Sequence, residues 1–322
     1  MYRSFIVFCV MITSVLALRA SVKPDFIVDR NGRGDYRNIA DVLEVLKDKD
    51  PTKTVTVYIR NGFYKEKLEL DSTVQNVHFI GESKERTIIN YDDHANIDNM
   101  RTFRTYTFKI GGRDFLFENL TFENTALQLG QAVAVHLTGD RTVFKNCRFL
   151  GNQDTIYAGE AGSRYYFEAC HIEGTTDFIF GPATAYFYRC DILCKKNSYI
   201  TAPNTSESIK YGFILDECTI HIDDGVTNVF LGRPWRPFGM TLFKNCYLPA
   251  EIDPLGWDNW RNEENEKTAR FMEFKNNGEG ANHQNRVKWS RVLTPQEAQD
   301  YTLYQVLAGD DHWNPLSISQ EK

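Results

Sequence analysis

From residue 55 onward, short apolar runs separated by Gly, Asn or Asp recur along the chain. VTVYI, NVHFIG, DFLFENLTFEN and AVAVHLTG are four of these runs. Alternating or continuous apolar residues that end at turn-forming residues are the signal of short β-strands. No long helical pattern lies between the runs, which argues against a sheet built from β-α-β units. The pattern therefore predicts an all-β protein.

One of these strand patterns repeats six times. Each copy has an apolar residue, two variable residues, Leu or Cys, a polar residue and another apolar residue: FENLTFEN (117–124), FKNCRFLG (144–151), FEACHIEG (167–174), FYRCDILC (187–194), LDECTIHI (215–222) and FKNCYLPA (243–250). The fourth positions lie 27, 23, 20, 28 and 28 residues apart. A β-rich repeat of this length is typical of one turn of a β-helix. We expect a single-stranded right-handed parallel β-helix.

Two segments outside the repeats predict helices at the chain ends. Residues 39–46 place apolar side chains at helical spacing. Near the C-terminus, Thr294, Pro295 and Glu297 form a capping box with proline at the first helical position. Terminal repeats need covers with a polar outer face. We therefore expect short helical caps at the N- and C-terminal ends of the β-helix.

The repeats also predict a ladder of cysteines inside the coil. Strand alternation turns the fourth and sixth positions of each repeat toward the core. The ladder cysteines are Cys147, Cys170, Cys190, Cys218 and Cys246. Small hydrophobic side chains packing in register are the simplest interpretation. Neighbouring pairs are also within disulfide range, because stacked strands lie about 4.8 Å apart.

A second periodic feature is polar. Asp154 follows Gln131 by 23 residues, and Asp177 follows Asp154 by 23. Arg233 follows Asp177 by 56 residues, the same interval that separates Cys246 from Cys190. Equal spacing predicts that all four side chains face one side of the coil. Gln153 can join them only if the backbone bends after Gly151 and Asn152, because neighbours on a regular strand face opposite sides.

Two adjacent carboxylates can divide acid and nucleophile roles if their environments separate their pKa values. Arg233 would keep one aspartate ionised, and nearby amides could donate to an oxyanion. These groups suit acyl transfer without serine, histidine, metal or other cofactor. The chain has no G-x-S-x-G or H-E-x-x-H motif. We interpret Asp92, Asp93 and His94 as a solvated turn and not as a metal site.

Composition bears on the compartment and on partners. The net charge is −6 with no basic run, which excludes nucleic acid as an expected partner. Residues 1–17 have the pattern of a secretory signal peptide, with cleavage possible as late as residue 20. No later run is long enough for a membrane span. We expect a secreted monomer with one domain at 18–315 and a disordered tail at 316–322. Asn119 and Asn204 lie in glycosylation motifs, although Asn119 falls in an expected strand.

Five ordered motifs resemble the pectin methylesterases: GFYKE (62–66), QAVAV (131–135), GNQDT (151–155), DFIFG (177–181) and LGRPW (231–235). The resemblance covers residues 26–313. It implies that Asp177 is the nucleophile on a galacturonate methyl ester in pectin and that Asp154 is the general acid and base. It also implies that Gln131 and Gln153 stabilise the oxyanion and that Arg233 orients Asp177. The residues that it implies as substrate contacts are Thr107, Gln131, Tyr157, Phe180, Arg233 and Trp235. Finally, it implies a disulfide between Cys170 and Cys190. In GFYKE, we expect Gly62 and Glu66 to fix a turn or a buried hydrogen bond.

Two other functional classes remain open from the sequence. A β-helical polysaccharide lyase or galacturonase would cleave the sugar chain itself, whereas an esterase releases methanol without new chain ends. A non-catalytic carbohydrate-binding solenoid would keep its function when Asp154 and Asp177 both become asparagine. Trp257 and Trp260 could line such a cleft or pack in the core.

Overall fold

The computed structural model describes residues 23–317. The predicted signal peptide lies outside the described residues, and so do residues 318–322 of the predicted tail. The two expectations for these segments therefore stay predictions.

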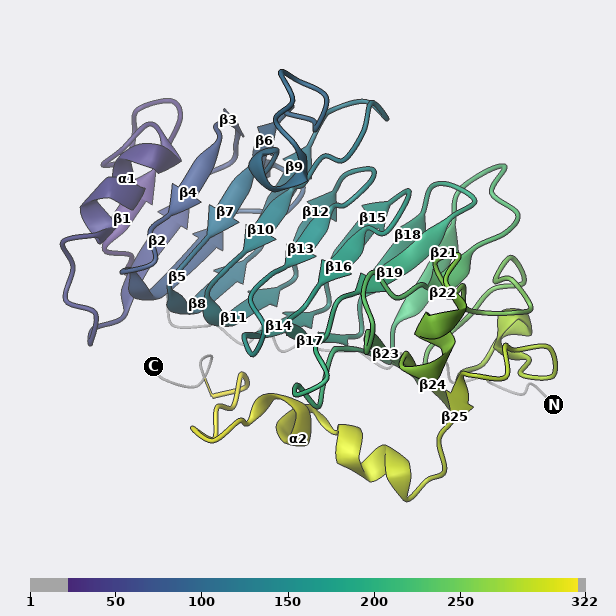
Figure 1. Cartoon of the computed structure of the whole chain (residues 1–322). Coiled ribbons are helices and arrows are strands. Elements are labelled where there is room, and N and C mark those ends of the chain that lie inside the picture. Colours follow the sequence, from purple (N-terminus) through teal and green to yellow (C-terminus); the bar gives the residue numbers. More distant parts are fainter. Residues whose placement is uncertain (1–22, 318–322) are drawn as a thin grey trace, which may run out of the picture.

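Three parallel sheets wind around one core (Figure 1), which confirms the right-handed parallel β-helix. The largest sheet has 11 strands, in the order β1 (Phe26–Val28), β2 (Val55–Ile59), β5 (Gln75–Gly81), β8 (Arg113–Glu118), β11 (Asp140–Lys145), β14 (Arg164–Glu168), β17 (Thr184–Tyr188), β20 (Phe213–Asp216), β23 (Met240–Lys244), β24 (Arg270–Phe274) and β25 (Arg291–Val292).

Two further sheets of seven strands complete each coil. The first contains β3 (Gly62–Lys65), β6 (Thr87–Tyr91), β9 (Thr121–Asn124), β12 (Arg148–Leu150), β15 (His171–Gly174), β18 (Asp191–Cys194) and β21 (Thr219–Ile222). The second, which we call the cleft sheet, contains β4 (Leu68–Leu70), β7 (Phe108–Ile110), β10 (Val135–Leu137), β13 (Ile156–Ala158), β16 (Ile179–Gly181), β19 (Tyr199–Pro203) and β22 (Phe230–Gly232).

A left-handed residue makes the sharp bend between the largest sheet and the next. The residue directly before each ladder position has a positive φ of 49° to 55°: Asn119, Asn146, Ala169, Arg189, Glu217 and Asn245. Non-glycine residues adopt this region at a cost, and asparagine adopts it most readily. Asn119 therefore lies in a turn and not in the expected strand, and its Oδ1 accepts a 2.6 Å hydrogen bond from Asn146.

The core consists of side chains stacked from coil to coil. Phe117, Phe144, Phe167 and Phe187 stack with ring centroids 4.5–5.1 Å apart. The ladder cysteines lie in this core, each at most 1% exposed, as the alternation predicted. All six cysteines among residues 23–317 are free, so the Cys170–Cys190 disulfide implied by the resemblance is wrong for this structure. Both thiols instead contact carbonyl oxygens of the backbone, at 3.4–3.6 Å.

The N-terminal cap is confirmed. Helix α1 (Ile39–Leu46) buries its four apolar positions and contacts β1 and β4. The carboxylate of Glu66 accepts hydrogen bonds from the Ile39 and Ala40 N–H groups at 3.1 and 2.9 Å. These are N–H groups that a helix N-terminus leaves without an intrahelical partner. Glu66 of the GFYKE motif is therefore structural, as expected.

The C-terminal helices form, but their expected place at the end of the coil was wrong. The Thr294–Glu297 capping box is present, with Thr294 N–H donating to Glu297 at 2.8 Å, ahead of a 3₁₀ helix, η4 (Glu297–Tyr301), and α2 (Leu303–Leu307). This segment runs back along the outer face of the largest sheet (Figure 1). Its apolar residues cover Tyr166, Tyr186 and other side chains of that face. Arg164 fixes it by donating to Leu307 O and Ala308 O at 3.3 and 3.1 Å.

Three other 3₁₀ helices interrupt the loops: η1 (Thr102–Arg104), η2 (Glu263–Lys267) and η3 (Glu279–Ala281). Asp92 and Asp93 pair with Lys65 and Lys67, respectively, in a loop next to the cleft sheet. Within residues 23–317, no helix combines the length and the apolar composition that crossing a membrane requires.

Candidate active site

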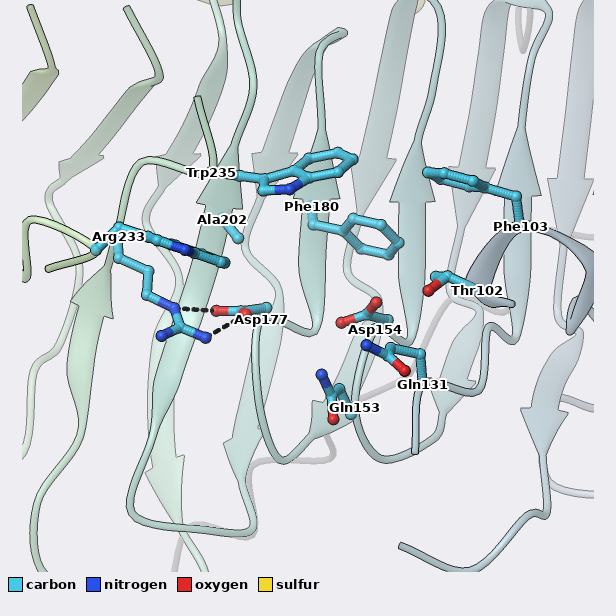
Figure 2. A pocket seen from close by; sticks show the side chains of 11 residues that line it. Thr102, Phe103, Gln131, Gln153, Asp154, Asp177, Phe180, Ala202, Arg233 and Trp235 are labelled. Carbon is cyan, nitrogen blue, oxygen red and sulfur yellow. Dashed lines mark hydrogen bonds and ion pairs between the residues drawn. The ribbon is translucent and has the colours of Figure 1, made fainter. Parts of the chain in front are cut away.

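A cleft of about 220 Å³ lies on the outer face of the cleft sheet. Its walls come from the loops that precede β10, β13 and β16, from the segment after β22 and from η1. Two carboxylates, two amides, one arginine and several aromatic rings lie around it (Figure 2). The lining residues are Thr102, Phe103, Gln131, Gln153, Asp154, Asp177, Phe180, Ala202, Arg233, Trp235 and Trp260. The predicted polar residues therefore meet at one place.

Asp154 and Asp177 occupy equivalent places on adjacent coils. Each lies two residues before an isoleucine, and these two isoleucines, Ile156 and Ile179, pair in register. Both aspartates have a left-handed backbone, with φ of 67° and 51°. Non-glycine residues in this region cluster at functional sites, where the surrounding structure holds them. The bend at Asp154 also lets its side chain and that of Gln153 face the same cleft, as the sequence required.

Gln131 and Arg233 also reach the cleft, as predicted, but not through the equal register that their spacing suggested. Gln131 lies four residues before Val135, which pairs with Ile156, so it is not in register with Asp154. Arg233 lies three residues beyond Phe230, whose register partner Tyr199 corresponds to the position of Asp177. Loops of unequal length bring both side chains into the cleft.

Arg233 holds Asp177 through two parallel hydrogen bonds (Figure 2). Nε donates to Oδ1 at 2.9 Å and Nη2 donates to Oδ2 at 2.7 Å. Bidentate pairs of this kind fix orientation as well as charge. The guanidinium itself is held between two aromatic rings, 3.8 Å from the Trp260 centroid and 3.9 Å from that of Tyr199. The two rings and the Asp177 carboxylate therefore fix the position of the Arg233 guanidinium.

Arg233 separates the pKa values of the two buried carboxylates. Burial chiefly raises the pKa of Asp154 well above its usual value, and the neighbouring Asp177 raises it further. Burial also raises the pKa of Asp177, but the hydrogen-bonded Arg233 opposes that rise. Asp177 is thus the group that ionises first as pH increases. The site can present an ionised Asp177 beside a protonated Asp154.

Replacing Arg233 by glutamine should move the acidic limb of the rate profile to higher pH. Arg233 lowers the pKa of Asp177, so without it the carboxylate ionises only at higher pH. The rate at the optimum should fall roughly 10²-fold, because Asp177 is no longer aimed. The Arg233→Lys variant keeps the charge and should show a smaller shift. Rate profiles of the three proteins with an ester substrate measure this, and an unmoved limb would contradict it.

Replacing Asp154 by asparagine should stabilise the folded protein at pH 7. Because burial raises the folded-state pKa of Asp154, this group lowers the free energy of unfolding as pH rises above the unfolded pKa of about 3.9, and the cost is complete above the folded-state pKa. Removing about 1 kcal/mol of this cost would raise Tm by roughly 2 °C or more. The gain should shrink as pH falls toward 4, and it should be smaller for Asp177→Asn. Thermal unfolding at both pH values tests this.

Aromatic residues form the rest of the cleft. Phe180 lies 4.9 Å from the Tyr157 ring and 6.0 Å from the Trp235 ring, between centroids. Phe103 from η1 is 42% exposed and packs 4.9 Å from Tyr157. Tyr157 does not line the cleft itself but packs behind Phe103 and Phe180. Of the predicted apolar wall, Phe180 and Trp235 line the cleft, and Phe103 extends the wall beyond the residues that the sequence identified.

Thr107 does not line the cleft, so its predicted substrate contact was wrong. It is fully buried, and its hydroxyl donates to the Glu123 carbonyl at 2.8 Å. Thr102 lines the cleft instead. Of the two tryptophans left open by the sequence, Trp260 lines the cleft whereas Trp257 is 1% exposed and stacks on Phe271.

Comparison with known proteins identifies similar sequences. The model of the Pectinesterase family matches residues 25–310. The chain is 38% identical to Pectinesterase 31 of Arabidopsis thaliana over 282 residues, which covers 84% of this chain and 88% of that protein. It is 36% identical to Probable pectinesterase/pectinesterase inhibitor 21 of the same plant, covering 93% of this chain and 46% of that protein. The chain thus spans about half the length of several of its relatives.

Solved structures match the whole fold. A pectin methylesterase from carrot superimposes with a TM-score of 0.87 at 28% identity, covering 94% of this chain and 98% of that one. A pectin methylesterase in complex with hexasaccharide VII gives a TM-score of 0.79 at 29% identity, covering 92% and 99%. The likeness extends through all three sheets.

Proposed function

Because this chain belongs to the pectinesterase family, we propose that it hydrolyses the C6 methyl esters of galacturonate units in pectin to give pectate and methanol. The observation that carries the proposal is the buried pair of aspartates, of which only Asp177 is bound by an arginine. The hexasaccharide complex of a similar esterase supports an oligosaccharide substrate.

In the first half of the proposed reaction, an ionised oxygen of Asp177 attacks the ester carbonyl. The tetrahedral oxyanion accepts hydrogen bonds from the amides of Gln131 and Gln153, which lie beside Asp154 in Figure 2. Asp154 gives its proton to the methoxy oxygen as the carbon–oxygen bond breaks. Methanol leaves, and the substrate acyl group remains on Asp177 as an anhydride.

In the second half, Asp154 is a carboxylate and acts as the base. It takes a proton from water as the water oxygen attacks the acyl carbon. The bond to Asp177 breaks, which returns Asp177 as a carboxylate paired with Arg233 and Asp154 as an acid. The product is released as a carboxylic acid that gives its remaining proton to the solvent, and the enzyme regains its starting state.

Binding in this proposal relies on the aromatic walls. Phe180 and Trp235 offer apolar faces to sugar rings and methyl groups, with Tyr157 supporting them. The esterified polymer is uncharged at each methylated unit, which suits a cleft with a single paired arginine. We further propose a secreted monomer that binds neither nucleic acid nor membrane, and glycosylation at Asn204 and Asn119. The N-terminal sequence pattern supports secretion, the net charge of −6 argues against nucleic acid, and the two acceptor motifs support glycosylation.

Product analysis tests the reaction class. Purified protein should release methanol from esterified pectin without new reducing ends and without unsaturated products. New reducing ends would indicate a galacturonase, and unsaturated products a lyase. A protein that binds pectin but releases none of these products would instead be a carbohydrate-binding solenoid.

A further inference from the structure

A second cavity lies near the C-terminal end of the largest sheet, outside the cleft. It encloses about 260 Å³ between β23, β24, η4 and the loop at 204–212. Three cations and three aromatic rings line it, together with two methionines and an alanine: Lys210, Arg270, Arg291, Phe271, Trp289, Tyr301, Met240, Met272 and Ala269. No aspartate or glutamate from the described part of the chain is among its walls. This composition is unusual for a chain with a net charge of −6.

Arg270 is the central cation. Its guanidinium donates to four backbone carbonyls, of Phe238, Ile209, Lys210 and Ser206, at 2.9–3.2 Å. Arginine has five N–H donors, so one N–H on Nη2 stays available. No ion pair joins Arg270 to a carboxylate anywhere in residues 23–317. A partly buried charge with only neutral partners favours an anion beside it.

Two exposed cations strengthen the field at the mouth of the cavity. Arg291 pairs with Glu297, but that carboxylate also accepts from Thr294 in the capping box and lies outside the lining. The Lys210 ammonium lies 4.8 Å from the Tyr211 ring centroid and forms no ion pair within residues 23–317, although the charge of Asp300 acts on it. Arg270 and Lys210 therefore face the cavity without an ion pair to a carboxylate of the described residues, whereas the charge of Arg291 is paired with Glu297.

We propose that this pocket binds the free carboxylate of a de-esterified galacturonate unit, the product of the reaction. Arg270, Lys210 and Arg291 supply positive charge, and a guanidinium suits a carboxylate. Trp289 and Tyr301 supply flat apolar faces for a sugar ring. A bare inorganic anion would use the cations but leave these rings uncovered. The identity of the ligand rests on the proposed function, whereas the anion site does not.

One segment of the chain contributes to both the pocket and the cleft. Arg270 binds the Phe238 carbonyl through Nε and the Gly239 carbonyl through its backbone N–H at 2.9 Å. Both carbonyls belong to the segment that begins with Arg233 and Trp235, which line the cleft. The loop that carries Arg233 and Trp235 is therefore anchored by the central cation of the pocket.

The test uses unesterified trigalacturonate as the probe and calorimetry as the readout. Lys210→Glu reverses one exposed charge of the pocket without removing the Arg270 bonds that hold the loops. Lys196→Glu makes the same change in charge on an exposed residue of another sheet edge. We expect Lys210→Glu to weaken trigalacturonate binding about tenfold at low salt and Lys196→Glu to leave it unchanged. Trp289 fluorescence should change on binding, and Trp289→Phe should remove that change.

Three outcomes would overturn the proposal. These are no binding of trigalacturonate by the wild type, equal binding by the two glutamate variants, or equal binding of inorganic phosphate and trigalacturonate. The binding result can also be judged independently of the proposed esterase activity. A protein that binds trigalacturonate as described but releases no methanol from pectin would keep the pocket and refute the proposed function.

Discussion

The Asp177→Asn variant should lose at least about 10⁴-fold in the rate of methanol release from esterified pectin. An amide cannot form the anhydride that the proposed reaction requires. Arg233 also loses the charged partner that it binds at 2.7 and 2.9 Å. The aromatic walls are unchanged, so binding of an esterified oligosaccharide should weaken much less than turnover. Initial rates and equilibrium binding on the same protein measure both quantities.

A matched change shows whether the loss is specific to the site. Asp224 is an exposed aspartate in the turn after β21, and Asp224→Asn makes the same chemical change there. It should retain the wild-type rate. An Asp177→Asn protein that keeps more than about one hundredth of the wild-type rate would exclude Asp177 as the nucleophile.

The two aspartates could be aligned from sequence because a simple geometric condition holds. The loops that lead into β13 and β16 place Asp154 and Asp177 at the same distance from paired isoleucines. An interval of 23 residues in the sequence then corresponds to one full coil. The condition fails for Gln131 and Arg233, because their loops differ in length by several residues from those of the aspartates. Chain spacing alone cannot show on which sheet an insertion lies.

Other features depend on contacts between distant segments. The capping box correctly predicted a C-terminal helix, but only the apolar outer face of the largest sheet decides where that helix packs. Trp260 holds Arg233 although it follows it by 27 residues in an irregular loop. In contrast, the left-handed turns had a local signal, since asparagine precedes the ladder position at Asn119, Asn146 and Asn245.

The Asp154→Asn variant should lose about 10²–10⁴-fold in methanol release, for a different reason from Asp177→Asn. Methoxide is a poor leaving group, and Asp154 is the buried acid placed to protonate it. A galacturonate oligomer esterified with a nitrophenol carries a leaving group that departs without a proton. With this substrate, the first half of the reaction should recover in Asp154→Asn.

The second half of the reaction still needs a base, so recovery should be limited to one turnover. Asp154→Asn should release a burst of nitrophenol equal to the enzyme concentration and then turn over slowly, because water attacks the anhydride on Asp177 slowly when no base removes its proton. Asp177→Asn should show no burst, since it forms no anhydride. Rapid-mixing absorbance measurements on both variants record the burst directly. A burst from Asp177→Asn, or steady turnover without one from Asp154→Asn, would contradict the division of roles that the Arg233 pairing of Asp177 supports.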